Sequence, residues 1–197
     1  VRRGDGCGVL VDTGPDLGDQ LLAHGISAFE HVIYTHTHAD HVAGIDELRG
    51  INRQISKAIN AYGTADVLEE LQQRFAYVFK PVTPPHFFRA ALVGCPVTLG
   101  RAVSIGGYEF TLFEQNHGYV TSMGIRCGAF AYSTDVVELP AEAMECLHGV
   151  QTWMVDCFQR TPHGAHAWLE RVLEWKARIQ PQRLILTHMG MEMDWEW

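Results

Sequence analysis

The sequence predicts a mixed α/β protein, and two features of its apolar pattern carry this prediction. In the first 80 residues, short apolar segments alternate with stretches of helical periodicity. From residue 101 to residue 133 the pattern changes to period two, in short segments separated by glycine turns, which is typical of consecutive strands. A chain of 197 residues is long enough for one sizeable hydrophobic core. We therefore expect one domain over residues 1–197.

The first half is predicted to contain three strands and three helices. The expected strands cover residues 7–12, 31–34 and 57–62. The expected helices cover residues 16–23 and 40–49, and a third begins after Thr64 as its N-cap. The apolar residues at helical spacing, which should be buried, are Leu17, Leu21 and Leu22 in the first helix and Val67, Leu68, Leu71 and Phe75 in the third.

Residues 80–100 are predicted to form a long irregular loop, because four prolines stand at positions 81, 84, 85 and 96. Long loops often serve as lids or substrate walls, and the segment His86–Arg89 at its centre has the residues to cover a pocket. An ordinary packed loop explains the same composition.

The second half is predicted to be rich in strands. These are expected at residues 101–105, 108–114, 122–127, 129–133, 152–157 and 184–187. A short helix is expected from Pro140 to His148. Thr161 and Pro162 are expected to begin the longest helix, because an apolar stripe follows them at helical spacing, formed by Trp168, Val172, Trp175 and Ile179.

The composition argues against several classes of binding partner. With 15 basic and 23 acidic residues, the formal charge of −8 argues against a general nucleic-acid or anionic-membrane surface. The five cysteines are scattered and form no Cys-x-x-Cys pair, so neither a disulfide framework nor a cysteine-built zinc site is indicated. There is no apolar run of 18 residues and no signal peptide. We expect a cytoplasmic location, no membrane partner and no stable nucleic-acid complex.

The segment from Thr35 to His41 carries the strongest functional signal. It follows an apolar strand and reads His-x-His-x-Asp-His, with ligand types at His36, His38, Asp40 and His41. Imidazole and carboxylate are the ligand set of zinc and neighbouring transition metals. In an extended segment His36 and His38 project to the same side, so both can bind one ion. Asp40 and His41 follow in a bend, where they can face a second one.

Three further residues of ligand type stand where apolar strands end, at His117, Asp135 and His188. Each alone is explained equally well as a cap or a turn residue. Together with the opening motif they make seven ligands, which is enough for two ions with an open position for water.

These motifs resemble those of the metallo-β-lactamase-fold hydrolases. The resemblance rests on the His-rich motif, the turn at Asp12-Thr13-Gly14, Asn116-His117, Ser133-Thr134-Asp135 and Leu186-Thr187-His188. It implies an αββα sandwich in which two sheets face each other with helices outside. It also implies a dinuclear site: His36, His38 and His117 bind the first ion, Asp40, His41 and His188 bind the second, and Asp135 bridges the two.

Within this superfamily, the chain is similar to the branch of the phosphoribosyl 1,2-cyclic phosphate phosphodiesterase. True β-lactamases commonly have cysteine where Asp135 stands, and the diiron flavoprotein branch has glutamate where His38 stands. The phosphodiesterase branch has a further histidine, on the helix before the last ligand, and His166 matches it best, with His163 as the runner-up. That branch also carries a structural zinc, but this chain has no N-terminal cysteine cluster and has Met191 in place of a late histidine.

The resemblance favours a dinuclear metal-dependent phosphodiesterase with two ions, Zn²⁺ or Mn²⁺. A hydroxide bridging the ions would attack a small phosphorylated substrate, a cyclic phosphate or a nucleotide-like diester. We expect His166 and Asp40 to be catalytic, with His166 protonating the leaving group and, with His163, contacting substrate. Asp156 is expected to orient a ligand imidazole, and Cys157 to be a small buried residue.

Three alternatives remain open at this point. A thioester or lactone hydrolase of the glyoxalase II type has almost the same ligands. A tRNA 3′-processing nuclease shares the motif, although the acidic charge argues against it. The third alternative is not an enzyme: it is a regulatory domain whose metal site is inactive. The sequence predicts neither the native metal nor an oligomeric state.

Overall fold

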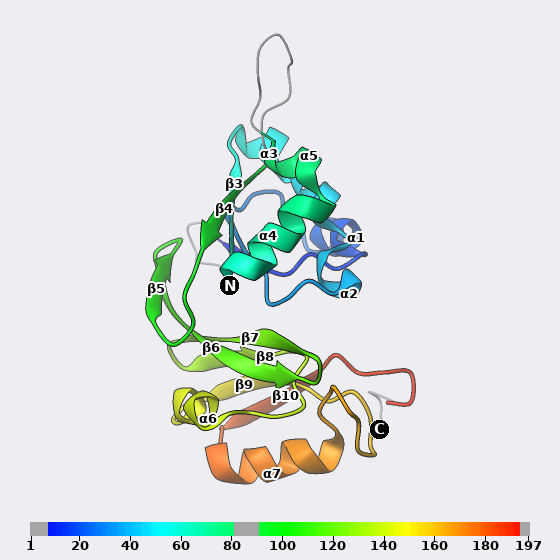
Figure 1. Ribbon diagram of the computed structural model, residues 1–197, viewed down its shortest axis with the longest axis vertical. Helices are drawn as coiled ribbons and strands as arrows, with labels where there is room; N and C mark the ends of the chain where they lie inside the picture. Colours follow the sequence, from blue (N-terminus) through cyan, green and yellow to red (C-terminus); the bar gives the residue numbers. More distant parts are fainter. Residues whose placement is uncertain (1–7, 81–90, 194–197) are drawn as a thin grey trace. The chain divides into compact units, whose positions relative to one another are not determined.

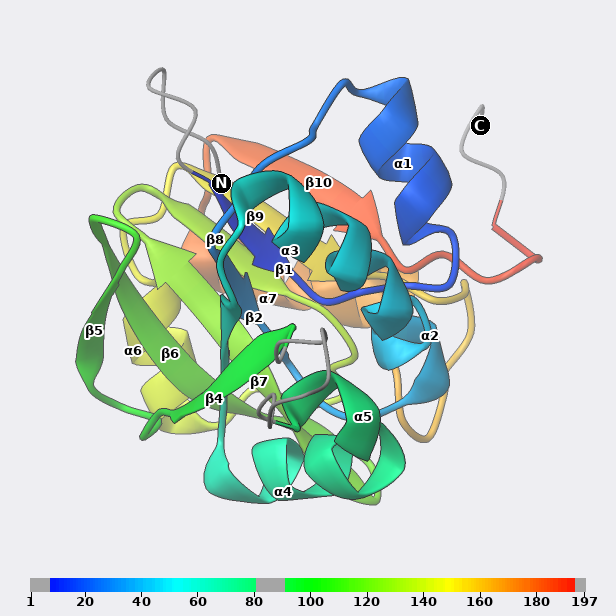
Figure 2. The same cartoon turned by 90° about the horizontal axis from the view of Figure 1, so that it is seen from above.

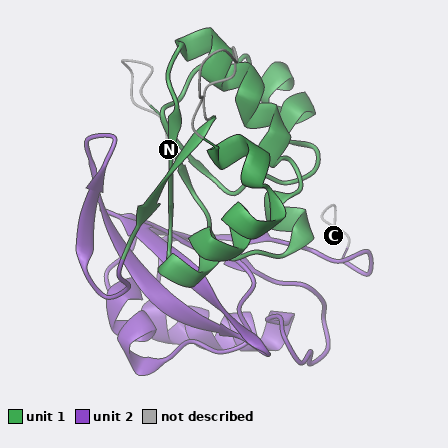
Figure 3. Cartoon of the chain, turned by 45° about the horizontal axis from the view of Figure 1, so that its top comes forward, with its two compact units in different colours: residues 1–97 green, residues 98–197 purple. Residues whose placement is uncertain are grey.

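The computed structural model describes residues 8–80 and 91–193, which fall into two compact units coloured separately in Figure 3. Unit 1 comprises residues 1–97 and unit 2 comprises residues 98–197. Cys7 and the segment His86–Arg89 lie outside the described residues, so the expectations about them are untested. The expectation of a single domain also stays a prediction. Within the described ranges no helix has the length and apolar character needed to cross a bilayer.

Unit 1 contains a four-stranded parallel sheet in the order β1-β2-β3-β4 (Figure 1). Its strands are β1 (Val9–Val11), β2 (His31–Ile33), β3 (Ile59–Gly63) and β4 (Leu92–Pro96). Its helices are α1 (Leu17–Ala23), α2 (Ala39–Val42), the 3₁₀ turn η1 (Ile45–Glu47), α3 (Leu48–Ile55), α4 (Ala65–Arg74) and α5 (Ala76–Phe79).

The core of unit 1 joins the sheet to its helices in one apolar cluster. Val32 and Ile59 from the strands are fully buried, as are Leu48 from α3 and Leu71 from α4. In β3 every second residue is buried, which is the period expected of a strand with one face on a core. The cluster fixes the helices to the strand whose end carries the His-rich motif.

Unit 2 contains a six-stranded sheet in the order β10-β9-β8-β7-β6-β5, in which each strand pairs with its predecessor in the chain (Figure 2). The pairs from β5 to β8 are antiparallel, and those from β8 to β10 are parallel. Its elements are β5 (Ala102–Ile105), β6 (Tyr108–His117), β7 (Val120–Cys127), β8 (Phe130–Ser133), α6 (Ala141–Leu147), β9 (Thr152–Asp156), α7 (Leu169–Ile179) and β10 (Arg183–Thr187).

The two helices of unit 2 share one buried cluster with the sheet. Trp153 of β9 is fully buried and lies with its ring 6.3 Å from that of Trp175 in α7. The indole N–H of Trp153 donates to the Ser133 hydroxyl at 3.1 Å, so its polar atom is satisfied inside the core. Leu147 of α6 and Val172 of α7 belong to the same cluster. The predicted fold class is confirmed: the chain is mixed α/β with two sheets.

Most predicted elements occur within a few residues of their expected bounds, but several expectations were wrong. Residues 92–96 are not loop but the edge strand β4, because pairing with β3 compensates for the weak strand propensity of Gly94 and Pro96. The expected helix over residues 40–49 is divided into α2, η1 and the start of α3. Leu22 is 81 % exposed rather than buried.

The longest helix, α7, begins at Leu169, not at Thr161. The side chains of the preceding loop bind its own backbone instead. The Gln159 amide donates to the carbonyl of Thr161 at 3.1 Å, and His163 Nδ1 accepts the N–H of Ala165 at 3.2 Å. Such local bonds compete with helix formation.

A close backbone approach fixes α2 against the turn that follows β1. A Cβ added at Gly44 would lie 2.1 Å from the carbonyl oxygen of Gly14, and the Gly44 N–H donates to the Thr13 carbonyl at 2.9 Å. The φ angle of Gly44 is −85°, so the need for glycine is steric and not conformational.

The substitution Gly44→Ala should therefore destabilise the protein by about 1–3 kcal/mol, because the new methyl group overlaps a main-chain oxygen. Urea unfolding of the metal-free protein measures this free energy. The matched control is Gly50→Ala in α3, where nothing lies within 4 Å of the added Cβ and alanine should stabilise by about 0.5–1 kcal/mol. Equal unfolding free energies for the two variants would contradict the steric argument.

Candidate metal centre

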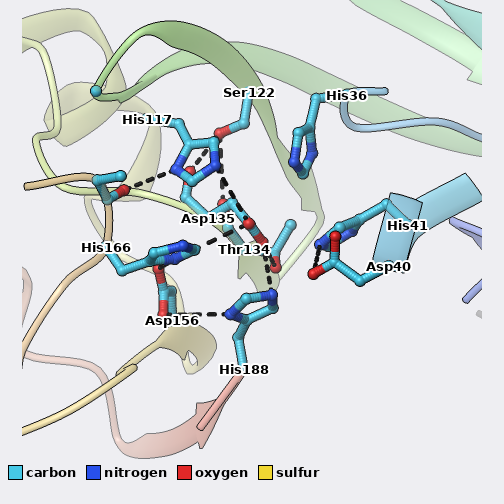
Figure 4. Close-up of polar contacts among 12 residues, drawn as sticks. His36, Asp40, His41, His117, Ser122, Thr134, Asp135, Asp156, His166 and His188 are labelled. Carbon is cyan, nitrogen blue, oxygen red and sulfur yellow. Dashed lines mark hydrogen bonds and ion pairs between the residues drawn. The ribbon is translucent and has the colours of Figure 1, made fainter. Parts of the chain in front are cut away.

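The four residues of the His-rich motif lie together at the end of β2 and the start of α2, and Figure 4 shows His36, Asp40 and His41 of this group. The ring of His36 lies 4.6 Å from that of His38 and 4.3 Å from that of His41, as expected of side chains that project to the same side. His41 Nε2 lies 3.5 Å from Asp40 Oδ2. His36 and His41 are buried, whereas His38 and Asp40 are exposed. Unit 1 thus gathers its four predicted ligands in one place.

Asp12 supports this group from the end of β1. Its carboxylate accepts the Thr35 N–H at 2.8 Å and the Thr35 hydroxyl at 2.7 Å, and it lies 2.8 Å from His41 Nδ1. An ionised carboxylate accepts from Nδ1–H, which leaves Nε2 of His41 as the nitrogen available to a metal. Sequence reasoning placed Asp12 only in a turn and missed this role. The sequence feature that could have identified Asp12 is its position directly after a strand, which the predicted ligands share.

Thr35 fixes the neighbouring imidazole in the same way. Its hydroxyl proton goes to Asp12, so its oxygen accepts from Nδ1 of His36, 3.1 Å away. Nε2 of His36 is then the ligand nitrogen. A single buried carboxylate therefore sets the tautomer of two predicted ligands, one directly and one through a hydroxyl.

In unit 2 the carboxylate of Asp135 lies between two imidazoles (Figure 4). Its Oδ2 is 3.4 Å from Nε2 of His117, and its Oδ1 is 3.3 Å from Nε2 of His188. Asp135 is 1 % exposed, and its Oδ1 accepts the Thr134 hydroxyl at 2.6 Å. Each oxygen of this carboxylate thus faces one imidazole, so the group offers nitrogen and oxygen donors at the same place.

In unit 2, a hydrogen bond fixes Nδ1 of the predicted ligand His117. His117 donates Nδ1–H to the Ala165 carbonyl at 2.7 Å, which leaves its Nε2 for a metal. His188 has Nδ1 at 3.9 Å from Asp156 Oδ1. Sequence reasoning expected Asp156 to orient a ligand imidazole, and its position agrees with this.

His166 lies in the loop between β9 and α7, not on a helix as expected. Its Nδ1 is 2.9 Å from Asp156 Oδ2, and this oxygen also accepts the Val136 N–H at 3.1 Å. The imidazole packs against two other rings, with its centroid 4.9 Å from that of His188 and 4.8 Å from that of Phe158. His166 is thus held in place directly beside a predicted ligand.

His163 has a different position. Its Nδ1 accepts the backbone N–H groups of Ala165 and His166, at 3.2 and 3.1 Å, so this nitrogen shapes the loop. Its ring lies 5.2 Å from that of His166. Of the two histidines considered as proton donors, the geometry favours His166.

The donor chemistry of each group fits a divalent transition-metal ion. Nitrogen and carboxylate oxygen face each other at 3.3–3.5 Å, and Nδ1 of the ligand imidazoles points to protein acceptors. Donor atoms of Asp156, His166 and His188 also lie within 4.8 Å of one another. Cys157 is fully buried, and burial raises the pKa of its thiol to about 11, with a further contribution from the Asp156 charge. It is therefore a packing residue and not a nucleophile.

The chain belongs to the β-lactamase superfamily domain family, whose model matches residues 8–189. It is 29% identical over 187 residues to an octanoyltransferase from Porphyromonas gingivalis, which covers 92% of this chain and 36% of that protein. It is 27% identical over 168 residues to the lactamase-like protein adaB from Aspergillus niger, covering 74% of this chain and 52% of that protein. The chain thus spans between about a third and about half of these relatives.

Among solved structures, a diphosphatase of the PhnP family is 28% identical with a TM-score of 0.86, covering 97% of this chain and 72% of that one. The metallo-β-lactamase fold protein YhfI from Bacillus subtilis is 18% identical, with a TM-score of 0.76 and coverage of 98% and 78%. The short form of human tRNase Z is 15% identical, with a TM-score of 0.73 and coverage of 96% and 84%. The last two share the fold alone. The resemblance to metallo-β-lactamase-fold hydrolases is confirmed.

The carboxylate of Asp12 yields a direct test of the support that it gives His41. Asp12→Asn keeps the shape but removes the charge that holds Nδ1–H, so affinity for Zn²⁺ should fall by about 10- to 100-fold. Competition with a chromophoric chelator measures this affinity, and far-UV circular dichroism checks folding. Asp46→Asn, which alters an exposed carboxylate paired with Arg49, is the control and should leave the affinity unchanged. Equal affinities in the two variants would exclude the role of Asp12.

Proposed function

We propose that the chain is a metal-dependent hydrolase that cleaves phosphoric diesters or anhydrides of a small substrate, in particular a cyclic phosphate or a nucleotide-like diester. One observation carries this proposal: the unit 2 site, in which Asp135 faces two imidazoles and His166 is held beside one of them. The PhnP-family diphosphatase supports it, since that relative is 28% identical across nearly the whole chain and acts on a diphosphate by name. We expect the partner to be a small phosphorylated molecule.

The proposal brings the predicted ligands of both units into one dinuclear centre. One ion would be held by His36, His38 and His117. The other would be held by Asp40, His41 and His188. Both ions would bind the carboxylate of Asp135. Zn²⁺ and Mn²⁺ suit these donors, with selection left to availability. When bound, such a pair of ions lowers the pKa of a water and neutralises charge on the phosphoryl group.

The protein's own contribution beyond the ligands is a positioned acid. Nδ1 of His166 is held by Asp156, so Nε2 of a protonated His166 is the atom that donates to the leaving oxygen. Stacking on Phe158 and His188 restricts ring rotation, which keeps that proton in one direction. Asp40 is exposed beside His41, and we propose that it also takes part in catalysis.

The second candidate function is hydrolysis of an acyl thioester or ester. The relative named octanoyltransferase favours it, since that name describes transfer of an acyl group. The chain spans only 36% of that protein, however, so the named activity can belong to the remainder.

A tRNA nuclease is less favoured because the net charge is −8. The four described cysteines, Cys95, Cys127, Cys146 and Cys157, are free thiols.

Turnover of model substrates distinguishes the two candidates. Protein loaded with Zn²⁺ or Mn²⁺ should release nitrophenol from bis-p-nitrophenyl phosphate, and Asp135→Ala should abolish this and reduce the metal content per chain. Rapid hydrolysis of octanoyl-coenzyme A without cleavage of the phosphodiester would favour the acyl hydrolase instead. Absence of metal from wild-type protein after loading, measured by elemental analysis, would contradict both hydrolases and favour a regulatory domain.

The acid role of His166 predicts a dependence on the leaving group. His166→Gln should lower kcat by about 100-fold or more for a poor alkoxide leaving group, and much less for p-nitrophenolate, which departs without a proton. Steady-state kinetics with methyl and nitrophenyl phosphodiesters measure the two ratios. The control is His148→Gln, which alters an exposed histidine at the end of α6 and should leave both rates unchanged. An equal loss on both esters in His166→Gln would refute the acid role.

A further inference from the structure

The threonine between the first two predicted ligands is bound from its opposite side by helix α4. The Thr37 hydroxyl donates to Glu70 Oε2 at 2.9 Å. The Arg74 guanidinium donates to Glu70 Oε1 at 3.1 Å and to the Thr37 carbonyl. Thr37, Glu70 and Arg74, hereafter the Thr37 triad, thus form a closed ring of three hydrogen bonds.

The alternation of an extended segment explains why this contact matters. His36 and His38 project to one side, where their rings lie 4.6 Å apart, so Thr37 projects to the other. The triad holds both the side chain and the carbonyl of this central residue. It therefore fixes the peptide units that set the directions of both imidazoles.

The helix that supplies the two charged residues is itself firmly anchored. Leu68 and Leu71 of α4 are buried in the core of unit 1, with Leu71 fully buried. Glu70 and Arg74 are four residues apart, so they project from the same face of α4 as neighbours. The strand end before the motif is tied to the same core by the Tyr34 N–H, which donates to the Tyr62 carbonyl at 2.8 Å.

We propose that Glu70 and Arg74 are positioning residues for the metal site, which hold the His-x-His segment with its two imidazoles already directed at one ion. An exposed ion pair adds little to the free energy of unfolding. Its effect here is geometric. Without the triad, Thr37 could rotate about its φ and ψ bonds, and this freedom would have to be lost when the ion binds. This inference rests on the proposed metal centre.

The experiment compares metal affinity with stability in matched variants. Arg74→Met removes the donor, and its control is Arg49→Met: the Arg49 side chain is exposed to the same 37 % and pairs with Asp46 at 3.2 Å, away from the motif. We expect Arg74→Met to bind Zn²⁺ about 10-fold more weakly than wild type, and Arg49→Met to bind it as wild type does. Tm values measured in EDTA should be the same for both.

Substitution of the threonine itself tests the same contact without changing charge. Thr37→Val removes the hydroxyl at constant shape and should weaken Zn²⁺ binding, while Thr37→Ser keeps the hydroxyl and should restore it. This pair still tests the inference if Arg74→Met does not fold.

The outcomes separate the two proposals. Equal Zn²⁺ affinities for wild type, Arg74→Met and Thr37→Val would overturn the role of the triad while leaving the metal centre intact. A loss of affinity that is matched by a lower Tm in EDTA would also overturn it, since it would then be a stability effect. Wild-type protein that binds no Zn²⁺ would instead refute the metal centre on which the inference rests.

Discussion

The candidate metal centre depends above all on which nitrogen of each predicted ligand imidazole carries the proton. An imidazole can offer Nε2 to a metal only when Nδ1 carries the proton, and burial makes it costly to leave that proton without an acceptor. Asp12, the Ala165 carbonyl and the Thr35 hydroxyl supply acceptors for His41, His117 and His36. For His41 and His117 the acceptor comes from a distant part of the chain, so the folding of the protein determines which nitrogen these imidazoles offer.

Strand ends carry this arrangement because the backbone there takes up a conformation unusual for these residues. Asp12, Asp135 and His188 each follow a strand and have φ angles of +57°, +47° and +53°. Aspartate tolerates the left-handed region better than most residues, but such a backbone persists only where its surroundings require it. The same local device serves both sheets.

Much of this was predictable from the order of residue types alone. Apolar runs that end in His or Asp located all seven predicted ligands, since period and termination are both local properties of sequence. The partners of those ligands were harder to predict. Asp12 looked like a turn residue, and Ala165 acts through a carbonyl that every residue possesses. The start of α7 was misplaced because side-chain bonds around His163 outweigh a pattern that would otherwise be helical. The two kinds of error differ in cause: the partners of the ligands come from distant segments, whereas the start of α7 depends on local bonds that apolar periodicity does not report.

The order of strands has a consequence for how the protein is made. In unit 2 every strand pairs with the one synthesised just before it, so the sheet can grow at a single edge as the chain leaves the ribosome. Neighbouring pairings keep loop-closure costs low and favour rapid folding. The strand added last, β10, leads into His188. On a nascent chain, most of the strands of unit 2 are therefore synthesised before His188, the second imidazole beside the carboxylate of Asp135.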